Sequence, residues 1–242
     1  MNATQAYYDF GLNRRLTVSL ERIGEEQEPV LVIEDVLADP GALVDYAARE
    51  VTFAPVWGPK GGYPGIRAPA PLNYVERLVR ALSPTIEKAF GLEQVALARA
   101  ECNFSLVTLP PDRLAPLQRI PHADTSDPLQ FALLHYLCDA RFGGTAFYRQ
   151  RATGFETLRP ERVTDYEQAR EQELGTGAGG AYIAGDSGAY LQIAAFEARP
   201  NRAIIYRSRT LHSGQISDPS LLSDDPRRGR LTANIFVNYR QA

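Results

Sequence analysis

Pro121-His122-Ala123-Asp124 places an imidazole and a carboxylate two positions apart in the chain. On an extended strand, side chains at positions i and i+2 point to the same side, so His122 and Asp124 can contact one ion together. Another imidazole, His212, stands much later, in the sequence Leu-His-Ser-Gly. We expect His212 to approach from another strand and to complete a group of two imidazoles and one carboxylate.

Two histidines and one carboxylate form the facial ligand set of non-haem iron(II) sites. This set adds only one negative charge and leaves octahedral positions open for further ligands. A His-x-Asp tripeptide is a weak signal when it stands alone, because such tripeptides arise by chance. The alternative for residues 121–124 is a surface Asx turn beside an imidazole, and the rest of the chain must decide between the two.

The composition is that of an ordinary globular protein, and 242 residues suffice to bury a substantial core. The net charge of −3 predicts that the chain binds neither nucleic acid nor an anionic membrane surface. Cys102 and Cys138 lack metal-binding spacing, which argues against a disulfide framework and favours a reducing compartment. No signal peptide and no apolar run of membrane-spanning length is visible, so we expect a cytoplasmic protein.

The first 94 residues predict two strands and two helices. Residues 15–23 alternate as an edge strand does, and residues 29–36 are rich in β-branched side chains. Asp39, followed by a proline, predicts the N-cap of a first helix. An amphipathic pattern over residues 73–90 predicts the second helix, which Gly91 ends as a C-cap.

Two segments differ from the elements around them. Residues 53–71 contain many prolines and glycines, which predict a loop that is either packed by its own aromatic residues or turned toward a substrate. Residues 151–185 are charged and then rich in glycine and alanine, with helix character over 159–174. We interpret this second segment as an insertion between strands that holds few core residues and that can serve as a lid.

The rest of the chain, from residue 95 onward, predicts short strands separated by turns. The fold class that follows is mainly β with a helical layer: a double-stranded β-helix, that is, a jelly-roll and cupin-like core preceded by N-terminal helices. We expect a single domain over residues 1–242, with residues 1–94 before the core and residues 95–242 forming it. The strands of the core are expected at 97–109, 131–138, 143–148, 190–196, 202–206 and 230–239.

Three further motifs give the His-x-Asp pair a context. Leu-His-Tyr-Leu at 134–137 is followed by Phe-Gly-Gly-Thr-Ala-Phe at 142–147, and His212 follows an apolar strand and precedes Ser-Gly. Arg230 and Thr232, separated by one leucine, open the last strand. In this order the motifs resemble those of the prolyl-hydroxylase-like Fe(II)/2-oxoglutarate-dependent dioxygenases. More narrowly, the whole chain resembles a bacterial family of unknown substrate that is grouped with these oxygenases.

The resemblance implies a metal site and a reaction. His122, Asp124 and His212 would be the catalytic metal ligands for Fe(II), with 2-oxoglutarate as cosubstrate and O2 as oxidant. The reaction would couple decarboxylation of 2-oxoglutarate to succinate with oxidation of the substrate, most simply hydroxylation of a C–H bond. The substrate would be a small molecule or a peptide, and its identity and the variant of the reaction stay open.

The resemblance also implies residues that contact the cosubstrate. Arg230 would hold the distal carboxylate of 2-oxoglutarate through its planar pair of donors, a geometry that lysine does not offer. Strand alternation puts Arg230, Thr232 and Asn234 on one face, so Thr232 can donate a second hydrogen bond there. Tyr136 matches the position of a cosubstrate contact or simply packs in the core. Asn103 either reaches the cosubstrate or a metal-bound water, or plays no part in the site.

The remaining histidine, His135, alternates with Leu133 and Leu137. We therefore expect it in the core or beside the site rather than as a ligand.

Two other classes of function compete with the dioxygenase. One is a cupin-like metal-binding protein, an isomerase or a sensor, without 2-oxoglutarate chemistry; Arg230 argues against it, because such a protein needs no carboxylate anchor at that position. The other is a non-catalytic β-sandwich module that uses residues 53–71 to bind a peptide or glycan. The oligomeric state is open, with a homodimer as one option.

Overall fold

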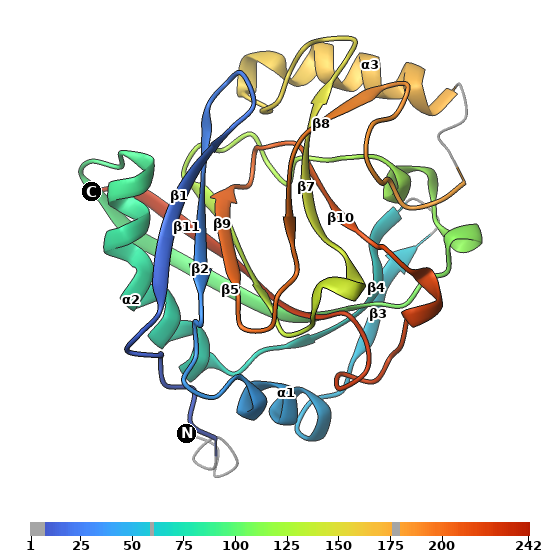
Figure 1. The fold of residues 1–242 in the computed structure, drawn as a ribbon. Coiled ribbons are helices and arrows are strands. Elements are labelled where there is room, and N and C mark those ends of the chain that lie inside the picture. The colour runs from blue at the N-terminus through green and yellow to red at the C-terminus, as the bar shows by residue number, and fades with distance from the viewer. Residues whose placement is uncertain (1–7, 59–60, 176–179) are drawn as a thin grey trace.

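The computed structural model describes residues 8–58, 61–175 and 180–242. This part of the chain is mainly β, with an eight-stranded and a three-stranded antiparallel sheet and three α-helices (Figure 1). The strands are β1 (Thr17–Ile23), β2 (Glu28–Glu34), β3 (Ala54–Gly58), β4 (Gly61–Pro69), β5 (Val95–Val107), β6 (Gln130–Tyr136), β7 (Gly144–Gln150), β8 (Tyr190–Glu197), β9 (Ala203–Arg207), β10 (His212–Gln215) and β11 (Leu231–Gln241). The α-helices are α1 (Pro40–Arg49), α2 (Leu72–Phe90) and α3 (Val163–Gly175). Short 3-10 helices are η2 (Pro111–Arg113), η3 (Pro116–Arg119), η4 (Ala140–Phe142), η5 (Pro160–Arg162) and η6 (Pro219–Leu221).

The large sheet has the strand order β1-β2-β9-β6-β11-β5-β4-β3, and the small sheet has the order β10-β7-β8. Strands β6 and β11 lie at the centre of the large sheet, so both edges of each strand are hydrogen-bonded to a neighbouring strand. Alternation along β11 sends Leu231, Ala233 and Ile235 to one face, and Arg230 and Asn234 to the other, as the sequence predicted.

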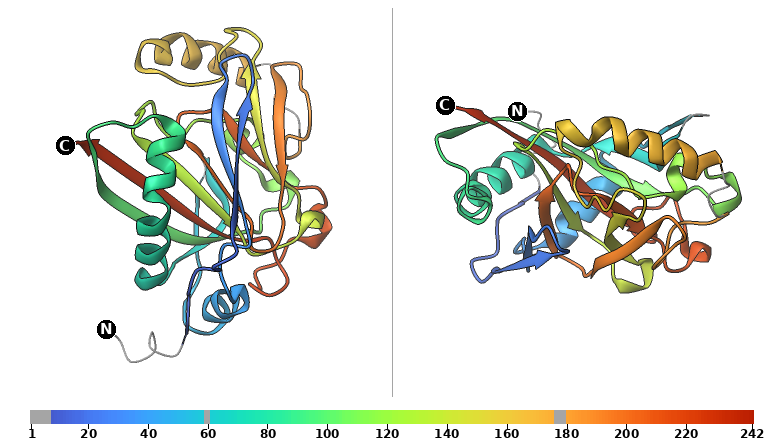
Figure 2. Two further views of the ribbon diagram at one scale, coloured as in Figure 1. Left: turned by 60° about the vertical axis from the view of Figure 1, so that its left-hand side comes forward. Right: turned by 90° about the horizontal axis from the view of Figure 1, so that it is seen from above.

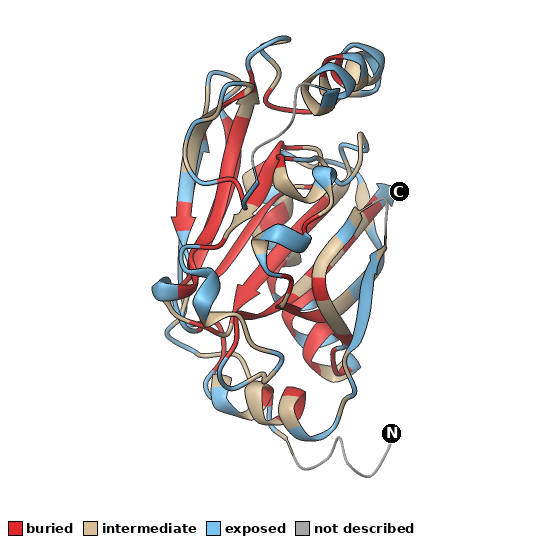
Figure 3. Ribbon diagram, turned by 90° about the vertical axis from the view of Figure 1, so that its right-hand side faces the viewer, coloured by how far each residue is buried: buried red, intermediate tan, exposed pale blue. Residues whose placement is uncertain are grey.

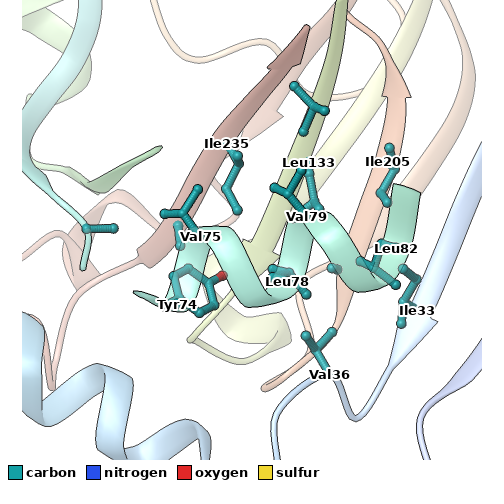
Figure 4. Close-up of a cluster of buried hydrophobic side chains, with 14 of the residues drawn as sticks. Ile33, Val36, Tyr74, Val75, Leu78, Val79, Leu82, Leu133, Ile205 and Ile235 are labelled. Carbon is teal, nitrogen blue, oxygen red and sulfur yellow. The ribbon is translucent and has the colours of Figure 1, made fainter. Parts of the chain in front are cut away.

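One face of the large sheet is covered by α1 and α2. The apolar side of α2, including Val75, Leu78 and Leu82, packs on Leu133 of β6 and Ile205 of β9 (Figure 4). The charged side of the helix faces outward, which is the pattern of an amphipathic surface helix. Figure 2 shows α2 along the outside of the sheet. This face is therefore an apolar layer.

The other face of the large sheet packs on the small sheet. Leu134 and Tyr136 of β6, Tyr206 of β9, Phe147 of β7 and Phe196 of β8 share one buried cluster. Figure 3 shows that the buried residues are concentrated in the strands of the two sheets. The two sheets thus form a sandwich, and His212 lies in β10, an edge strand of the small sheet.

Both predicted helix boundaries that rested on capping residues are confirmed. The Asp39 carboxylate accepts hydrogen bonds from the backbone N–H groups of Gly41 and Ala42, which begins α1. Gly91 ends α2 with φ of 62°, a left-handed conformation that glycine adopts without a steric penalty.

The prediction of a loop over residues 53–71 is wrong, because most of this segment forms the hairpin of β3 and β4; residues 59–60 lie outside the described part. Proline breaks a strand only where its missing N–H is needed, and Pro55 lies in the edge strand of the sheet. Gly65 permits the close approach of β4 to β5, since a Cβ atom there would lie 1.9 Å from the Leu106 carbonyl oxygen. The prolines and glycines therefore mark an edge hairpin instead of a loop.

The helix predicted within residues 151–185 is α3, at the opposite end of the molecule from α1 (Figure 1). The segment contributes more to the core than its composition indicated, because Leu158, Tyr166 and Ile183 pack with Tyr148 of β7 and Tyr190 of β8. The strand β10, which begins with His212, is absent from the predicted strands because it has only four residues and contains a glycine. No helix within the described ranges is both long and apolar enough to span a membrane.

Candidate active site

Backbone pairing brings the candidate ligands together. The N–H of His122 donates to the carbonyl oxygen of His212 at 2.9 Å, and the N–H of His212 donates to that of His122 at 2.9 Å. Two residues on, the N–H of Asp124 donates to the carbonyl oxygen of Ser208 at 2.8 Å. The segment before β6 is thus held as an extended neighbour of the chain that leads into β10. This pairing gives His122 and Asp124 the same-side arrangement expected from their spacing.

The three side chains converge as predicted. Nε2 of His122 lies 3.6 Å from Oδ1 of Asp124, and Nε2 of His212 lies 3.8 Å from Oδ2 of the same carboxylate. All three ligand atoms lie within 4.8 Å of one another. Atoms that bind one transition-metal ion at about 2.1 Å are themselves ~3 Å apart in an octahedral arrangement. A small contraction of the cluster would therefore bring the three side chains onto one ion.

Exposure differs among the three ligands. The side chain of His122 is 51% exposed, that of Asp124 is 19% exposed and that of His212 is 9% exposed. A bound ion would thus contact the buried His212 on its inner side. Solvent or a substrate would reach the ion on the side of the exposed His122. The cluster is neither sealed in the core nor spread on the surface.

Hydrogen bonding prepares His212 as a ligand. Its Nδ1 lies 2.9 Å from the carbonyl oxygen of Thr210, so Nδ1–H donates to that carbonyl and the lone pair of Nε2 faces the cluster. Burial lowers the pKa of His212 to about 4, against the opposing effect of Asp124. Burial alone would raise the pKa of Asp124, but His212 and His122 outweigh it and the net direction is downward. A neutral imidazole and an ionised carboxylate are the forms that bind metal.

Arg230 lies immediately before β11 and is only 4% exposed. One amino group, Nη2, donates to the carbonyl oxygen of Gly144 at 2.6 Å, and the guanidinium lies 6.0 Å from the centre of the Tyr136 ring. Its Nε is buried without a hydrogen-bond partner, and the guanidinium has no salt-bridge partner among the described residues. A buried guanidinium without a carboxylate is costly, so this one fits a ligand that brings its own anion.

The other predicted cosubstrate contacts have protein partners. Thr232 is fully buried, and its hydroxyl lies 3.5 Å from the carbonyl oxygen of Ser105. The Tyr136 hydroxyl donates to the Thr145 hydroxyl at 2.7 Å, and burial raises the pKa of Tyr136 to about 12. Asn103 is half-buried on β5 and does not line either cavity beside the ligands. The structure thus brings Arg230 into the site and places Asn103 outside it.

His135 lies on the helix-covered face of the large sheet, away from the cluster. Its Nδ1 lies 2.9 Å from the Tyr74 hydroxyl, and its Nε2 lies 3.2 Å from Oδ1 of Asn201. That amide oxygen also accepts from the N–H of Leu37, so Nε2–H donates to it and Nδ1 accepts from the tyrosine. The expectation that His135 is a core residue is confirmed.

Two connected cavities open beside the ligands. The inner one, of about 110 Å³, is bounded by the candidate metal ligands His122, Asp124 and His212, and by Arg230 and Tyr206. The outer one, of about 530 Å³, extends from His122 and Asp124 toward Tyr182 and Arg170 of the segment between β7 and β8. Both cavities contain Tyr63, Arg67 and Arg230 in their walls. The outer cavity has the size of a site for a small organic molecule.

The sequence allowed that residues 53–71 are turned toward a substrate, but it did not single out Tyr63 or Arg67 as site residues. Residues 63–68 carry a usable signal, since Tyr63, Gly65 and Arg67 alternate with residues of the opposite face such as Ile66 and Ala68. The hydroxyl of Tyr63 is buried, and Tyr63 lines both cavities. Burial raises the pKa of Tyr63 against the lowering effect of Arg230 and Arg67, so the hydroxyl stays a donor.

Comparison with known proteins gives similar solved structures and one matching family. No curated protein matches the chain. A similar solved structure is the non-haem α-ketoglutarate-dependent epimerase SnoN from nogalamycin biosynthesis, with 14% identity over 88% of this chain and 80% of that chain and a TM-score of 0.46. HygX from Streptomyces hygroscopicus, with nickel and 2-oxoglutarate bound, has 13% identity over 88% and 84% and a TM-score of 0.46. EvdO2 from Micromonospora carbonacea var. aurantiaca, complexed with 2-oxoglutarate, has 11% identity over 93% and 96% and a TM-score of 0.42.

The sequence itself matches one family model over nearly its whole length. The match covers residues 14–237, and the family is described as a family of unknown function, DUF6445. The chain therefore belongs to the DUF6445 family.

Proposed function

We propose that this protein is a 2-oxoglutarate-dependent non-haem iron dioxygenase. The observation that carries the proposal is the convergence of His122, Asp124 and His212 within 4.8 Å, beside a cavity that also contains the unpaired guanidinium of Arg230. Two neutral imidazoles and one carboxylate suit iron(II), and a buried arginine suits the distal carboxylate of 2-oxoglutarate.

The donor atoms of His122, Asp124 and His212 are chemically suited to iron(II). The hydrogen bond from His212 to the Thr210 carbonyl fixes the tautomer whose Nε2 can bind a metal, and the three side chains leave other coordination positions free. Iron(II) in such a site, together with 2-oxoglutarate and O2, supplies the oxidising chemistry that protein side chains lack.

The other residues of the inner cavity would bind and orient the cosubstrate and shield the metal ligands. Nη2 of Arg230 is held by the Gly144 carbonyl, which fixes the plane of the guanidinium, while Nε stays available to an anion. The buried hydroxyl of Tyr63 is a further donor in the same wall. The Tyr206 ring lies 4.9 Å from the ring of His212 and covers its inner side, which keeps water away from that ligand.

The substrate, in this proposal, is a small molecule or a peptide that enters the outer cavity and is hydroxylated while 2-oxoglutarate is converted to succinate. The proposal includes a cytoplasmic location and one jelly-roll domain of the double-stranded β-helix type over residues 1–242. The sandwich of two antiparallel sheets, with its ligands at one edge, supports that assignment.

Calorimetric titration of 2-oxoglutarate into the nickel(II)-loaded protein tests the role of Arg230. The Arg230→Met variant should bind 2-oxoglutarate about 10- to 100-fold more weakly, because it loses a charge-assisted contact of 1.5–3 kcal/mol. The matched control is Arg228→Met, since Arg228 is an exposed arginine two residues away and its loss should change nothing. Equal affinity in the Arg230→Met variant and the wild type would instead favour a cupin-like metal protein without 2-oxoglutarate chemistry.

A further inference from the structure

We propose that the organic substrate carries a carboxylate and that Arg67 binds it in the outer cavity. The inference rests on the proposed function, and it names the class of the substrate. Arg67 belongs to β4 and lines both cavities, together with the candidate metal ligands His122 and Asp124.

Arg67 is held in place but is not neutralised. Its Nε donates to the Ser105 hydroxyl at 3.1 Å, and its guanidinium carbon lies 4.3 Å from the centre of the Tyr63 ring. Within the described residues, neither of its two terminal amino groups donates a hydrogen bond and no carboxylate forms a salt bridge with it. The side of the guanidinium that carries a parallel pair of donors is therefore available to a planar anion.

The position of Arg67 is built into the sheet. Arg67 pairs with Ser105 across β4 and β5, so its hydrogen-bond partner lies directly opposite on the neighbouring strand. Gly65, two residues earlier on the same face, lets the backbones of β4 and β5 meet closely. A side chain that is stacked on a ring and anchored at Nε loses little freedom when it binds a ligand.

The charges of the proposed metal and cosubstrate site cancel without Arg67. Iron(II), the Asp124 carboxylate, doubly charged 2-oxoglutarate and the Arg230 guanidinium together carry no net charge. Among the other side chains of the outer cavity, Arg170 is paired with Glu167. Arg67 is then the one uncompensated charge in the described wall, and an anion of the substrate would neutralise it.

The surroundings of Arg67 indicate what else the substrate carries. Val107, Leu117, Ile120, Ile216 and Phe236 provide apolar surface in the same cavity. A single unpaired cation within such a wall favours a monocarboxylate with an apolar body over a polyanion or a sugar.

Matched pairs of acids and amides test this inference. Hexanoate and 3-phenylpropanoate would be titrated into protein loaded with nickel(II) and 2-oxoglutarate, alongside hexanamide and 3-phenylpropanamide. Each acid should bind about tenfold more tightly than its amide, because it gains a charge-assisted hydrogen-bond pair. In the Arg67→Met variant the ratio of the two affinities should fall to about one, while the affinity for 2-oxoglutarate falls much less than it does in Arg230→Met.

Arg113→Met is the matched control, because Arg113 also stacks on an aromatic residue of the hairpin, Trp57, yet is exposed and lies outside the cavity walls. It should keep the preference for acids. Acids that bind no better than amides, or that do not bind at all, would overturn the inference. So would a loss of 2-oxoglutarate affinity in Arg67→Met as large as in Arg230→Met. If the wild type binds no 2-oxoglutarate, the proposed function fails, and the acid preference of Arg67 is measured separately on the nickel(II) form.

Discussion

His135 and His212 are both buried histidines, and burial lowers the pKa of each to about 4, yet their ring nitrogens have different partners. His135 lies on the face of the large sheet that α2 covers, and both of its nitrogens are hydrogen-bonded within the protein. His212 has one nitrogen bound to the Thr210 carbonyl and the other turned toward Asp124. Low pKa alone therefore does not distinguish a structural histidine from a ligand.

The difference follows from what each face of the sheet contains. On the helix side, Asn201 and Tyr74 are placed so that His135 completes a closed hydrogen-bond network. On the side of the small sheet, the backbone pair of His122 and His212 leaves Nε2 of each imidazole facing the Asp124 carboxylate, at 3.6 Å and 3.8 Å. Unsatisfied donor and acceptor atoms in a wall are thus the better sign of a site.

Replacing His212 in the ligand cluster and His135 on the helix-covered face should give the largest difference in metal affinity between two variants. His212→Ala should weaken binding of cobalt(II) at least about 100-fold, since even the loss of a partner that only orients a ligand costs 10- to 100-fold. His135→Gln should leave the affinity for the metal unchanged, although it too removes a buried imidazole. Titration followed by the visible absorption of cobalt(II) measures both, and a similar loss in the two variants would contradict the assignment.

The hydrogen-bond network of His135, Tyr74 and Asn201 should contribute to the stability of the fold and not to metal binding. Asn201 binds the N–H and carbonyl of Leu37 as well as His135, and it has φ of 66°. Asn201→Ala should lower the free energy of unfolding by about 3 kcal/mol, because buried partners lose hydrogen bonds and alanine disfavours this conformation. Urea denaturation of the metal-free protein gives the value. Asn201→Gly removes the same hydrogen bonds but tolerates the left-handed conformation. If the hydrogen bonds dominate, this variant should lose most of the unfolding free energy that Asn201→Ala loses.

The titration of His135 should be visible in the pH dependence of the unfolding free energy. Its pKa is lower in the folded protein than in the unfolded chain, so its contribution is complete above about pH 6.5 and declines as the pH falls toward 4. Between pH 7.5 and 5 this amounts to about 2 kcal/mol of unfolding free energy. His135→Gln, which keeps a donor and an acceptor, should lose that part of the slope. A variant with the slope of the wild type would show that His135 does not carry it.

The amino-acid sequence predicts much of the fold where local chemistry determines an element. The N-cap at Asp39, the C-cap at Gly91 and the alternation at Arg230 rest on backbone geometry, and the structure confirms all three positions. The convergence of His122 with His212 was predicted from ligand chemistry and motif order. Its cause, a two-residue backbone bridge between distant segments, has no local signal in the chain.

The hairpin of β3 and β4 was missed for a physical reason. Proline and glycine are breakers in an isolated segment, but at the edge of a sheet they cost little, and Gly65 is required by the close approach to Leu106. That requirement depends on β5, which is separated from β4 in the sequence by the whole of α2. Tyr63 and Arg67 were missed with it, and with them the cationic wall of the cavity.

Anaerobic addition of iron(II) and then 2-oxoglutarate tests the central claim most directly, because chelation of the metal by the cosubstrate produces a visible charge-transfer band. If His122, Asp124 and His212 hold the iron, the band should need both components, reach its maximum at one iron per chain, and be lost in His212→Ala but kept in His135→Gln. Absence of the band in the wild type, or its persistence in His212→Ala, would contradict the assignment of His122, Asp124 and His212 as the iron ligands.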